Sequence, residues 1–268
     1  MKYIIIIAVV VMAIRLARRR SGKTVTYTTP AGKTWDLFTD AIRQNHLLIA
    51  GATGSGKSVL IHGLITTMLY RLPFDQPNGV QLILIDPKKV ELSQYKDLPH
   101  TITHAAGYTP SAWIAALNQA VSIMDRRYIR MEKQKQRTYQ GGDLYVVIDE
   151  WASIFKSTAG KQAYQLLMRL TSEGRAARVH VILATQVPKA NIIPTEIREN
   201  FDCRFALRTA NSIQSRVIME QSGCESLPRY GQGFFITPEG SALYDLPFVT
   251  DSEIQEILAW WNRQRKAA

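Results

Sequence analysis

The chain has 268 residues, of which 46% are hydrophobic, enough to build the core of one large domain or two small ones. With 33 lysines and arginines against 22 aspartates and glutamates, its formal net charge is +11, which favours a polyanionic partner such as nucleic acid or an anionic membrane face, although a merely soluble basic protein would share it. The two cysteines, Cys203 and Cys224, lack metal-ligand spacing and indicate no disulfide scaffold, so we interpret both as reduced packing residues.

The N-terminal segment begins with an apolar run, Tyr3–Ile14. Four arginines follow it, at Arg15, Arg18, Arg19 and Arg20. The run is shorter than the roughly 20 apolar residues of a full membrane span, although Lys2 and Arg15 could snorkel and lengthen it. A secretory signal would need a small-residue cleavage site, which we do not find, and a buried core segment is a further alternative. Because positive residues stay inside, we predict that residues 1–20 form a short apolar helix, a single-pass anchor in the inner membrane with the rest of the chain in the cytoplasm.

Residues 21–45 form a linker and a short lead-in segment in this prediction, and residues 46–268 form the main domain. Val25–Thr29 alternates weakly, as is typical of an edge strand, whereas Trp35–Gln44 has the pattern of a short amphipathic helix. This helix would lead into the first core strand, the four apolar residues Leu47–Ala50.

The stretch after that strand, Gly51–Ser58, fits the pattern G-x-x-x-x-G-K-[ST], and a helix is predicted next at Val59–Arg71. A strand, a loop and a helix in this order indicate a phosphate-binding loop rather than an ordinary glycine-rich turn. The glycines let backbone N–H groups point inward around phosphate oxygens, and the helix N-terminus adds positive potential. We predict that a nucleotide binds Gly51, Ala52, Thr53, Gly54, Ser55, Gly56, Lys57, Ser58 and Val59. Within this set Lys57 would reach the terminal phosphates of ATP, and the Ser58 hydroxyl would ligate Mg²⁺.

Strand and helix patterns then alternate along the chain. Strands are predicted at Val80–Ile85, Leu144–Ile148, Val179–Ala184, Phe205–Arg208 and Gly233–Ile236. Helices are predicted at Ser111–Gln136, Ala163–Glu173 and Asp251–Arg265. This alternation indicates an α/β fold with a mainly parallel sheet flanked by helices. We interpret the dense charge at the end of the helix 111–136 as a solvated face in preference to a direct DNA contact.

Two acidic residues, Asp149 and Glu150, directly follow the predicted strand Leu144–Ile148. The strand carries them to its C-terminal edge, where the phosphates would lie in a parallel sheet. Asp149 would hold Mg²⁺ mainly through water, and Glu150 would orient and deprotonate the attacking water, as a hydrolase requires. The alternative is an acid pair that only caps the strand. Thr185 and Gln186 end the next strand and would place a polar amide near the γ-phosphate, a signal with little specificity on its own.

Motifs more specific than these nucleotide-site patterns run in a fixed order through the chain. They are His46–Val59, Leu82–Lys88, Glu91–Ser93, Met124–Tyr128, Val147–Glu150, Arg175–Ala177 and Ile182–Gln186, then Ser215–Arg216, Gly223 and Gly231–Gly233. Together they resemble the motor domain of the FtsK/SpoIIIE family of DNA translocases, a P-loop ATPase, over about residues 45–251. The chain departs from the family where Thr-Gln-Arg-Pro reads Thr-Gln-Val-Pro at Thr185–Pro188, so one expected basic residue is missing.

The resemblance implies a RecA-like fold that works as a homo-oligomeric ring, expected to be a hexamer, around double-stranded DNA. In that ring Gln186 would sense the γ-phosphate, and Arg175 would be an arginine finger reaching a neighbour's ATP site, unless it is an ordinary surface arginine near a helix end. The predicted catalytic set is then Lys57, Glu150, Gln186 and Arg175. The DNA-facing loops of the family correspond to Lys156, Lys161, Lys189 and Arg198, which would contact phosphates without reading bases.

The leading hypothesis from the sequence is an ATP-driven pump for double-stranded DNA, tethered to the membrane and used in conjugation or in transfer of a mobile element or phage DNA. A relaxase or another transfer-machinery protein would be its partner. We expect no C-terminal winged helix and therefore no sequence-guided direction of movement. The alternatives are a related secretion or assembly ATPase that moves protein and a non-hydrolysing DNA-binding membrane protein. Intact Lys57, Ser58, Asp149 and Glu150 argue against the last, and the basic balance favours DNA over protein.

Overall fold

The computed structural model describes residues 26–28, 34–36, 38, 41–71, 79–246 and 250–267. The predicted membrane anchor, residues 1–20, lies outside these ranges, so its helix and its topology stay predictions. Within the described ranges, none of the helices is both long enough and apolar enough to span a membrane.

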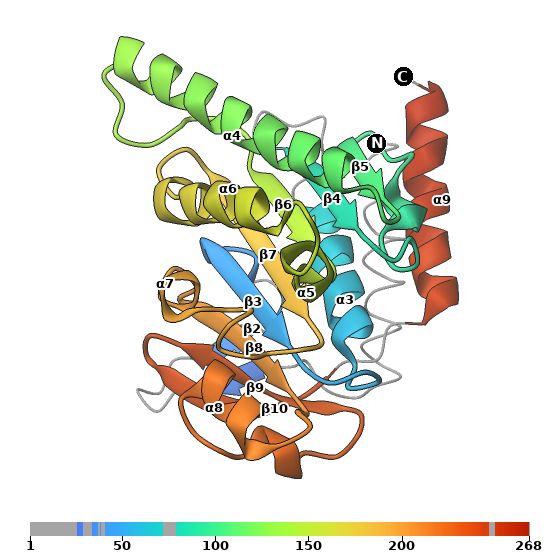
Figure 1. Cartoon of the computed structure of the whole chain (residues 1–268). Helices are drawn as coiled ribbons and strands as arrows, with labels where there is room; N and C mark the ends of the chain where they lie inside the picture. The colour runs from blue at the N-terminus through green and yellow to red at the C-terminus, as the bar shows by residue number, and fades with distance from the viewer. Residues whose placement is uncertain are drawn as a thin grey trace.

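An eight-stranded sheet forms the centre of the described structure (Figure 1). Its strands are β3 (His46–Ala50), β4 (Gln81–Asp86), β5 (Thr101–Ala106), β6 (Leu144–Ile148), β7 (Val179–Thr185), β8 (Cys203–Leu207), β9 (Gln232–Thr237) and β10 (Gly240–Asp245). Their order across the sheet is β10-β9-β8-β3-β7-β6-β4-β5. The strands from β8 to β5 run parallel, and β9 and β10 extend the sheet antiparallel. The predicted mainly parallel sheet is therefore confirmed.

Burial on both faces explains why the central strands are continuous apolar runs in the sequence. Every residue of β3, β6 and β7 is buried, because helices cover both sides of the sheet. β3 pairs with β7 on one side and with β8 on the other. The strands β4 to β7 lie on the first side of β3 and β8 to β10 on the second, so the chain changes direction across the sheet at β3. Ligands of open parallel sheets bind beyond the C-terminal ends of the strands at such a point.

The helices pack in two groups, one on each face of the sheet. One group is α3 (Lys57–Arg71) and α9 (Asp251–Ala267). The other is α4 (Pro110–Lys133), α5 (Trp151–Phe155), α6 (Gly160–Glu173), α7 (Thr195–Arg198) and α8 (Ser212–Met219). Two 3-10 helices, η1 (Ser93–Tyr95) and η2 (Cys224–Ser226), lie in the connections. Figure 1 shows the C-terminal half of α4 extending beyond the sheet.

The strands and helices predicted for the main domain are all present, with ends that shift by a few residues. The sequence patterns missed β5, β10, α5, α7 and α8. β5 and β10 lie at the two edges of the sheet, where only part of each strand is buried, so neither has a continuous apolar run. The missed helices are short, and a few residues cannot display a helical period.

The predicted lead-in helix, Trp35–Gln44, is wrong at its start. Trp35 lies in strand β2 (Thr34–Asp36), which pairs antiparallel with β1 (Thr26–Thr28). β1 falls within the stretch predicted as an edge strand. Ala41, further along the predicted helix, is helical and buried. Pairing between two segments determines the structure at Trp35, and an amphipathic pattern within one segment cannot report that pairing.

Candidate functional site

The phosphate loop leaves the C-terminal end of β3 and curls before α3 begins at Lys57. Its backbone has φ of +75° at Gly54 and +97° at Gly56, the left-handed region that glycine adopts without a steric penalty. A neighbouring strand fixes the start of the loop, because Ala52 N donates to the Arg208 carbonyl at 2.7 Å. The loop and the N-terminus of α3 therefore meet in the geometry of an anion site.

Lys57 lies inside this site and contacts Asp149. The Lys57 side chain is 5% exposed, and its Nζ donates to Asp149 Oδ1 at 2.8 Å and to the Asp149 carbonyl at 3.1 Å. The start of α3 and the end of β6 bring together these residues, which are 92 positions apart in the sequence. Burial raises the pKa of Asp149, and the charge of Lys57 partly opposes that shift. The predicted phosphate-binding lysine and one predicted Mg²⁺ ligand thus share one site.

The oxygen atoms around Lys57 fit a hydrated Mg²⁺ ion. Ser58 offers a hydroxyl and Asp149 a carboxylate, both of which Mg²⁺ accepts as ligands. The Ser55 hydroxyl, within the loop, is buried without a hydrogen-bond partner in the described part of the chain. Among the described residues, no group of three or more His, Cys, Asp or Glu could hold a metal by itself. A Mg²⁺ ion here would therefore take further ligands from phosphate oxygens and water, as it commonly does at nucleotide sites.

Glu150, the predicted base, is held through both oxygens of its carboxylate. Thr185 Oγ1 and Gln186 N donate to Oε1 at 3.0 and 3.1 Å. Lys88 Nζ donates to Oε2 at 3.4 Å. The Gln186 side chain in turn accepts from Thr53 Oγ1 at 3.0 Å. The predicted base and the predicted γ-phosphate sensor therefore lie together at the C-terminal edge of the sheet, beside the phosphate loop.

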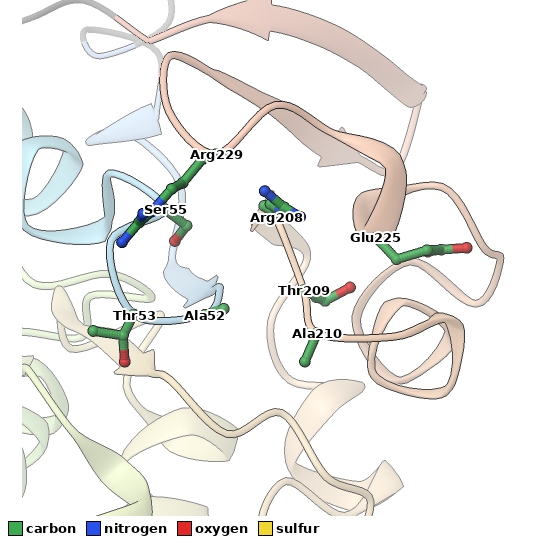
Figure 2. A pocket seen from close by; sticks show the side chains of 8 residues that line it. All are labelled: Ala52, Thr53, Ser55, Arg208, Thr209, Ala210, Glu225 and Arg229. Carbon is green, nitrogen blue, oxygen red and sulfur yellow. The ribbon is translucent and has the colours of Figure 1, made fainter.

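A hollow of about 370 Å³ adjoins the phosphate loop on the side of β8 (Figure 2). It is lined by Ala52, Thr53, Ser55, Arg208, Thr209, Ala210, Glu225 and Arg229. Arg229 lies close to the loop, since a Cβ atom added at Gly54 would be 3.7 Å from Arg229 Nε. Two guanidinium groups beside a phosphate loop suit an anionic ligand. Sequence reasoning missed both, and only Arg208 had a signal, its place directly after the strand beside β3.

Arg175, the predicted arginine finger, lies near the N-terminal ends of the parallel strands, whereas the phosphate loop lies at their C-terminal ends; we call these the N-terminal and C-terminal edges of the sheet. It is exposed in the turn between α6 and β7, so β7, seven residues or about 23 Å long, separates it from the edge with the phosphate loop. Arg175 lines a cavity of about 820 Å³ together with Tyr128, Asp143 and Arg178. The structure does not bring Arg175 to the phosphate loop of its own chain, and a contact with ATP would have to be made on another copy.

A buried network fixes the turn that carries Arg175. Arg178 donates two hydrogen bonds of 2.8 Å to the Asp143 carboxylate, and His180 Nε2 lies 2.9 Å from the same carboxylate. Although burial alone would raise the pKa of Asp143, hydrogen bonds from His180 and Arg178 lower it to about 2. Arg127 donates to two further carbonyls of the turn at 2.8 Å. These bonds attach the turn to α4 and to the start of β6, and Arg175 itself is exposed.

Three of the four predicted DNA-contact residues are exposed. Lys156 follows α5, Lys161 lies in the first turn of α6, and Lys189 lies in the loop after β7. Trp151 Nε1 donates to the Ile192 carbonyl at 2.9 Å, which ties α5 to the loop that contains Lys189. The two segments that carry the lysines are thus connected to each other and to the strand ends that hold the acids.

Arg198, the fourth, is bound into the protein. Its guanidinium donates at 2.8 Å to the Val217 carbonyl and to the Thr195 hydroxyl. These bonds hold α7 against α8 and leave the side chain half-buried. The structure therefore sets Arg198 apart from the exposed lysines, and its contact with DNA stays a prediction.

A family model and individual protein sequences are similar to this chain. A family model described as FtsK/SpoIIIE family matches residues 31–220. The chain is 37% identical over 245 residues to "DNA translocase FtsK" of Helicobacter pylori (strain ATCC 700392 / 26695), covering 86% of this chain and 28% of that protein. It is 33% identical over 268 residues to "DNA translocase FtsK" of Haemophilus influenzae, covering 86% of this chain and 50% of that protein. The chain thus spans about a quarter to a half of the length of these relatives.

Solved structures share the fold at lower sequence identity. The pCW3 conjugation coupling protein TcpA, in a monomer form with ATPγS, has a TM-score of 0.70 and 19% identity over 89% of this chain and 71% of that one. The cytoplasmic domain of the Type VII secretion ATPase EccC from Thermomonospora curvata has a TM-score of 0.70 and 19% identity over 88% of this chain and 30% of that one. Likeness at these identities shows the fold alone, and the predicted P-loop ATPase fold is confirmed.

Proposed function

This chain belongs to the FtsK/SpoIIIE family, and on that premise we propose that it is an ATP-hydrolysing motor that moves double-stranded DNA. One observation carries the proposal. At the C-terminal edge of the sheet, the phosphate loop, the Lys57–Asp149 pair and the doubly held Glu150 carboxylate come together from three separate parts of the chain. An acid held in this way beside a phosphate loop suits hydrolysis rather than nucleotide storage.

In the proposed reaction, N–H groups of the loop and the Lys57 ammonium bind the phosphate oxygens of ATP. Mg²⁺, held by Ser58 and through water by Asp149, would neutralise charge that develops on the phosphates. Glu150 orients a water molecule and accepts its proton, and the hydrogen bonds from Thr185 and Gln186 keep the carboxylate in place. Gln186 would sense the γ-phosphate through its contact with the phosphate loop.

The position of Arg175 supports a ring of identical subunits. Because this residue is exposed at the edge away from its own phosphate loop, it can complete only the site of a neighbouring copy. An arginine supplied in this way stabilises charge in the transition state and is worth about 10³-fold or more in hydrolysis. We propose that the ring is a hexamer and that each subunit supplies Arg175 to the next.

The three exposed lysines support DNA as the cargo. Lys156, Lys161 and Lys189 would contact backbone phosphates, which allows movement along any sequence. Trp151 directly follows Glu150 and bonds to the loop that contains Lys189, so a short covalent and hydrogen-bonded path links the base to a proposed DNA contact. A change at the γ-phosphate can therefore reach that contact without a large rearrangement.

We further propose that residues 1–20 tether the motor to the inner membrane, with the motor domain in the cytoplasm, and that the cargo is conjugative, mobile-element or phage DNA delivered by a relaxase or another transfer protein. The apolar run followed by arginines supports the tether. The shared fold with a conjugation coupling protein is compatible with the transfer role.

The test is the ATPase activity of the full chain in nanodiscs, with and without duplex DNA, beside the Glu150→Gln variant. We expect magnesium-dependent phosphate release that DNA increases and that rising salt suppresses. Phosphate release that DNA does not affect at any salt concentration would favour a protein cargo. No phosphate release from the parent chain, under conditions where it binds ATP, would contradict the motor itself.

A further inference from the structure

The turn between β4 and η1, residues 87–91, contacts the proposed ATP site, a role that the motifs Leu82–Lys88 and Glu91–Ser93 did not assign to it. Asp86, at the end of β4, is fully buried and binds both ends of this turn. Its carboxylate accepts from Lys88 N at 3.2 Å and from Leu92 N at 2.9 Å. One buried acid thus fixes the shape of the turn, and with it the directions in which the side chains of Lys88 and Glu91 leave.

Glu91 connects this turn to the beginning of α3. Its Oε1 accepts from Ser58 Oγ at 2.7 Å, and its Oε2 lies 3.2 Å from His62 Nε2. Ser58 and His62 are four residues apart and therefore share one face of the helix, so a single carboxylate reaches both. The other ring nitrogen of His62 lies 2.8 Å from the Tyr95 hydroxyl. His62 thus positions one oxygen of the Glu91 carboxylate, while the other oxygen accepts the hydrogen bond from Ser58.

The bond from Ser58 to Glu91 decides what the serine oxygen can do. A hydroxyl that donates its proton to a carboxylate keeps both of its lone pairs for a cation. Residues that orient a metal ligand in this way are commonly worth about 10- to 100-fold in metal affinity or activity.

Lys88 leaves the same turn toward the other half of the site. Its Nζ donates to Glu150 Oε2 at 3.4 Å, and the Lys88 side chain is 41% exposed whereas that of Glu150 is 4% exposed. Thr185 Oγ1 and Gln186 N bind Oε1, and Gln186 N also donates to Oε2 at 3.3 Å, so Lys88 adds a second contact to Oε2 from a different part of the chain. The turn therefore reaches a proposed magnesium ligand with one side chain and the proposed base with another.

We propose that residues 87–91 are a positioning element of the ATP site, in which Glu91 sets the Ser58 oxygen for Mg²⁺ and Lys88 holds Glu150 for proton transfer. This inference rests on the proposed function, because Ser58 and Glu150 belong to the proposed ATP site. Glu91 and Lys88 act through those residues and do not touch the reacting atoms. The proposal has two parts, which we call the Glu91 arm and the Lys88 arm. They predict different defects, because loss of Glu91 should weaken Mg²⁺-dependent ATP binding, whereas loss of Lys88 should slow turnover.

The first experiment measures binding of ATP to the full chain by calorimetry over a series of Mg²⁺ concentrations, with Glu150→Gln as the parent so that no ATP is consumed. We expect Glu91→Leu to raise the Mg²⁺ concentration needed for half-maximal tight binding by about 10-fold or more. Glu91→Gln keeps an acceptor for Ser58 and should recover most of the affinity. His62→Gln loosens Glu91 without touching Ser58 and should give a smaller shift in the same direction.

Thermal unfolding without nucleotide separates this effect from a loss of fold. A Glu91→Leu variant that is folded and follows the parent curve over the whole Mg²⁺ series would overturn the Glu91 arm. If Glu91→Leu does not fold, the arm is tested by His62→Gln, and a His62→Gln curve identical to the parent overturns it.

The second experiment compares steady-state hydrolysis by Lys88→Met and Lys89→Met, which alter neighbouring lysines on the same turn. We expect Lys88→Met to lower kcat several-fold with KM unchanged, Lys88→Arg to restore part of it, and Lys89→Met to match the parent. Equal kcat in the two Met variants would overturn the Lys88 arm. A parent chain that binds and hydrolyses no ATP would instead contradict the proposed function, so the two failures are distinguishable.

Discussion

The two ends of strand β6 carry the same residue type in opposite electrostatic environments. Asp143 precedes the strand, and Asp149 follows it. Burial tends to raise the pKa of both, but at Asp143 the hydrogen bonds from His180 and Arg178 overcome it and bring the pKa to about 2. At Asp149 burial dominates over the charge of Lys57, and the pKa is raised.

This difference distinguishes a structural carboxylate, Asp143, from a carboxylate of the proposed ligand site, Asp149. A carboxylate whose partners fully compensate its burial contributes to rigidity, whereas one that is only partly compensated can still gain from a cation or a phosphate-bound metal. The surroundings follow the same division, since the Ser55 hydroxyl near the second end is buried without a partner in the described residues. This division supports the proposals that ATP binds at the C-terminal ends of the strands and that Arg175, near their N-terminal ends, acts on another subunit.

The largest expected effect tests the ligand-binding edge. Glu150→Gln keeps the size of the side chain but removes the proton acceptor, and a general base is worth about 10²- to 10⁴-fold. We expect ATP binding to be kept and phosphate release to become undetectable or nearly so. Single-turnover phosphate release beside calorimetric ATP binding measures both. Undiminished hydrolysis would show that Glu150 is not the base. The acidic residues at both ends of β6 would then have only a structural role.

The second prediction concerns the edge that presents Arg175. Arg175→Ala should lower hydrolysis by about 10³-fold, because a neighbour's transition state loses its arginine, while ATP binding by the chain itself is unchanged. Mixing this variant with Glu150→Gln should restore part of the activity in rings where an intact base meets an intact Arg175. Arg137→Ala, which removes another exposed arginine, is the matched control. Absence of any recovery in mixed rings would argue against a role on a neighbouring subunit.

The ligand-binding edge could be predicted because its signals are local in the sequence. The spacing of glycines before Lys57 and the apolar strand before Asp149 each place a side chain at a strand end without knowledge of the fold. Parallel strands then bring those ends to one edge. The same logic, applied to the strand beside β3, would also have found Arg208.

The contacts of the supporting edge and of the positioning turn could not be predicted, because they join distant positions that show no periodic pattern, even though two motifs include Lys88 and Glu91. Asp143 and Arg178 are 35 positions apart, and Lys88 and Glu150 are 62 positions apart. Arg198 shows the same limit, since the sequence did not indicate that this basic residue is half-buried against α8. Only packing distinguishes an arginine that binds carbonyls from one that is exposed for phosphate.

The third prediction concerns the contribution of the Asp143 network to the stability of the fold. Asp143→Asn removes the charge that pairs with Arg178 and His180 and should lower the free energy of unfolding by about 3 kcal/mol, as expected when a buried charged group loses its partner. The control is Asp125→Asn, whose carboxylate pairs with Arg169 at the surface and should cost less than about 1 kcal/mol. Urea unfolding measures both. Equal effects would show that the network contributes no more than a surface ion pair.

A smaller effect follows from pH at the same edge. Burial, and secondly the charge of His180, lowers the pKa of His46 to about 3, and its Nδ1 accepts from Val181 N at 3.1 Å as a neutral ring does. Because the unfolded chain binds this proton near pH 6.5, stability is full above that value and falls as the pH decreases, by about 2 kcal/mol at pH 5. Asp143, with a pKa lowered to about 2, adds a loss only below about pH 4.

Urea unfolding of the parent and of His46→Gln at pH 7 and pH 5 checks the first of these losses. Gln retains a hydrogen-bond acceptor but does not titrate, so the difference between the two pH values should shrink by about 2 kcal/mol. The same pH dependence in both proteins would show that another group controls acid stability.

The smallest effect per residue is expected from the exposed lysines, because each contributes one screened phosphate contact. Replacing Lys156, Lys161 and Lys189 together by Gln should reduce the slope of log affinity for DNA against log salt by about 3, roughly one for each contact, with no preference among DNA sequences. The matched control replaces Lys133, Lys135 and Arg137, the basic residues at and just beyond the end of α4, where we interpret the charge as a solvated face. If the control triple lowers the slope and the lysine triple does not, DNA lies along α4. The path from Glu150 through Trp151 to the loop that contains Lys189 would then not lead to a DNA contact.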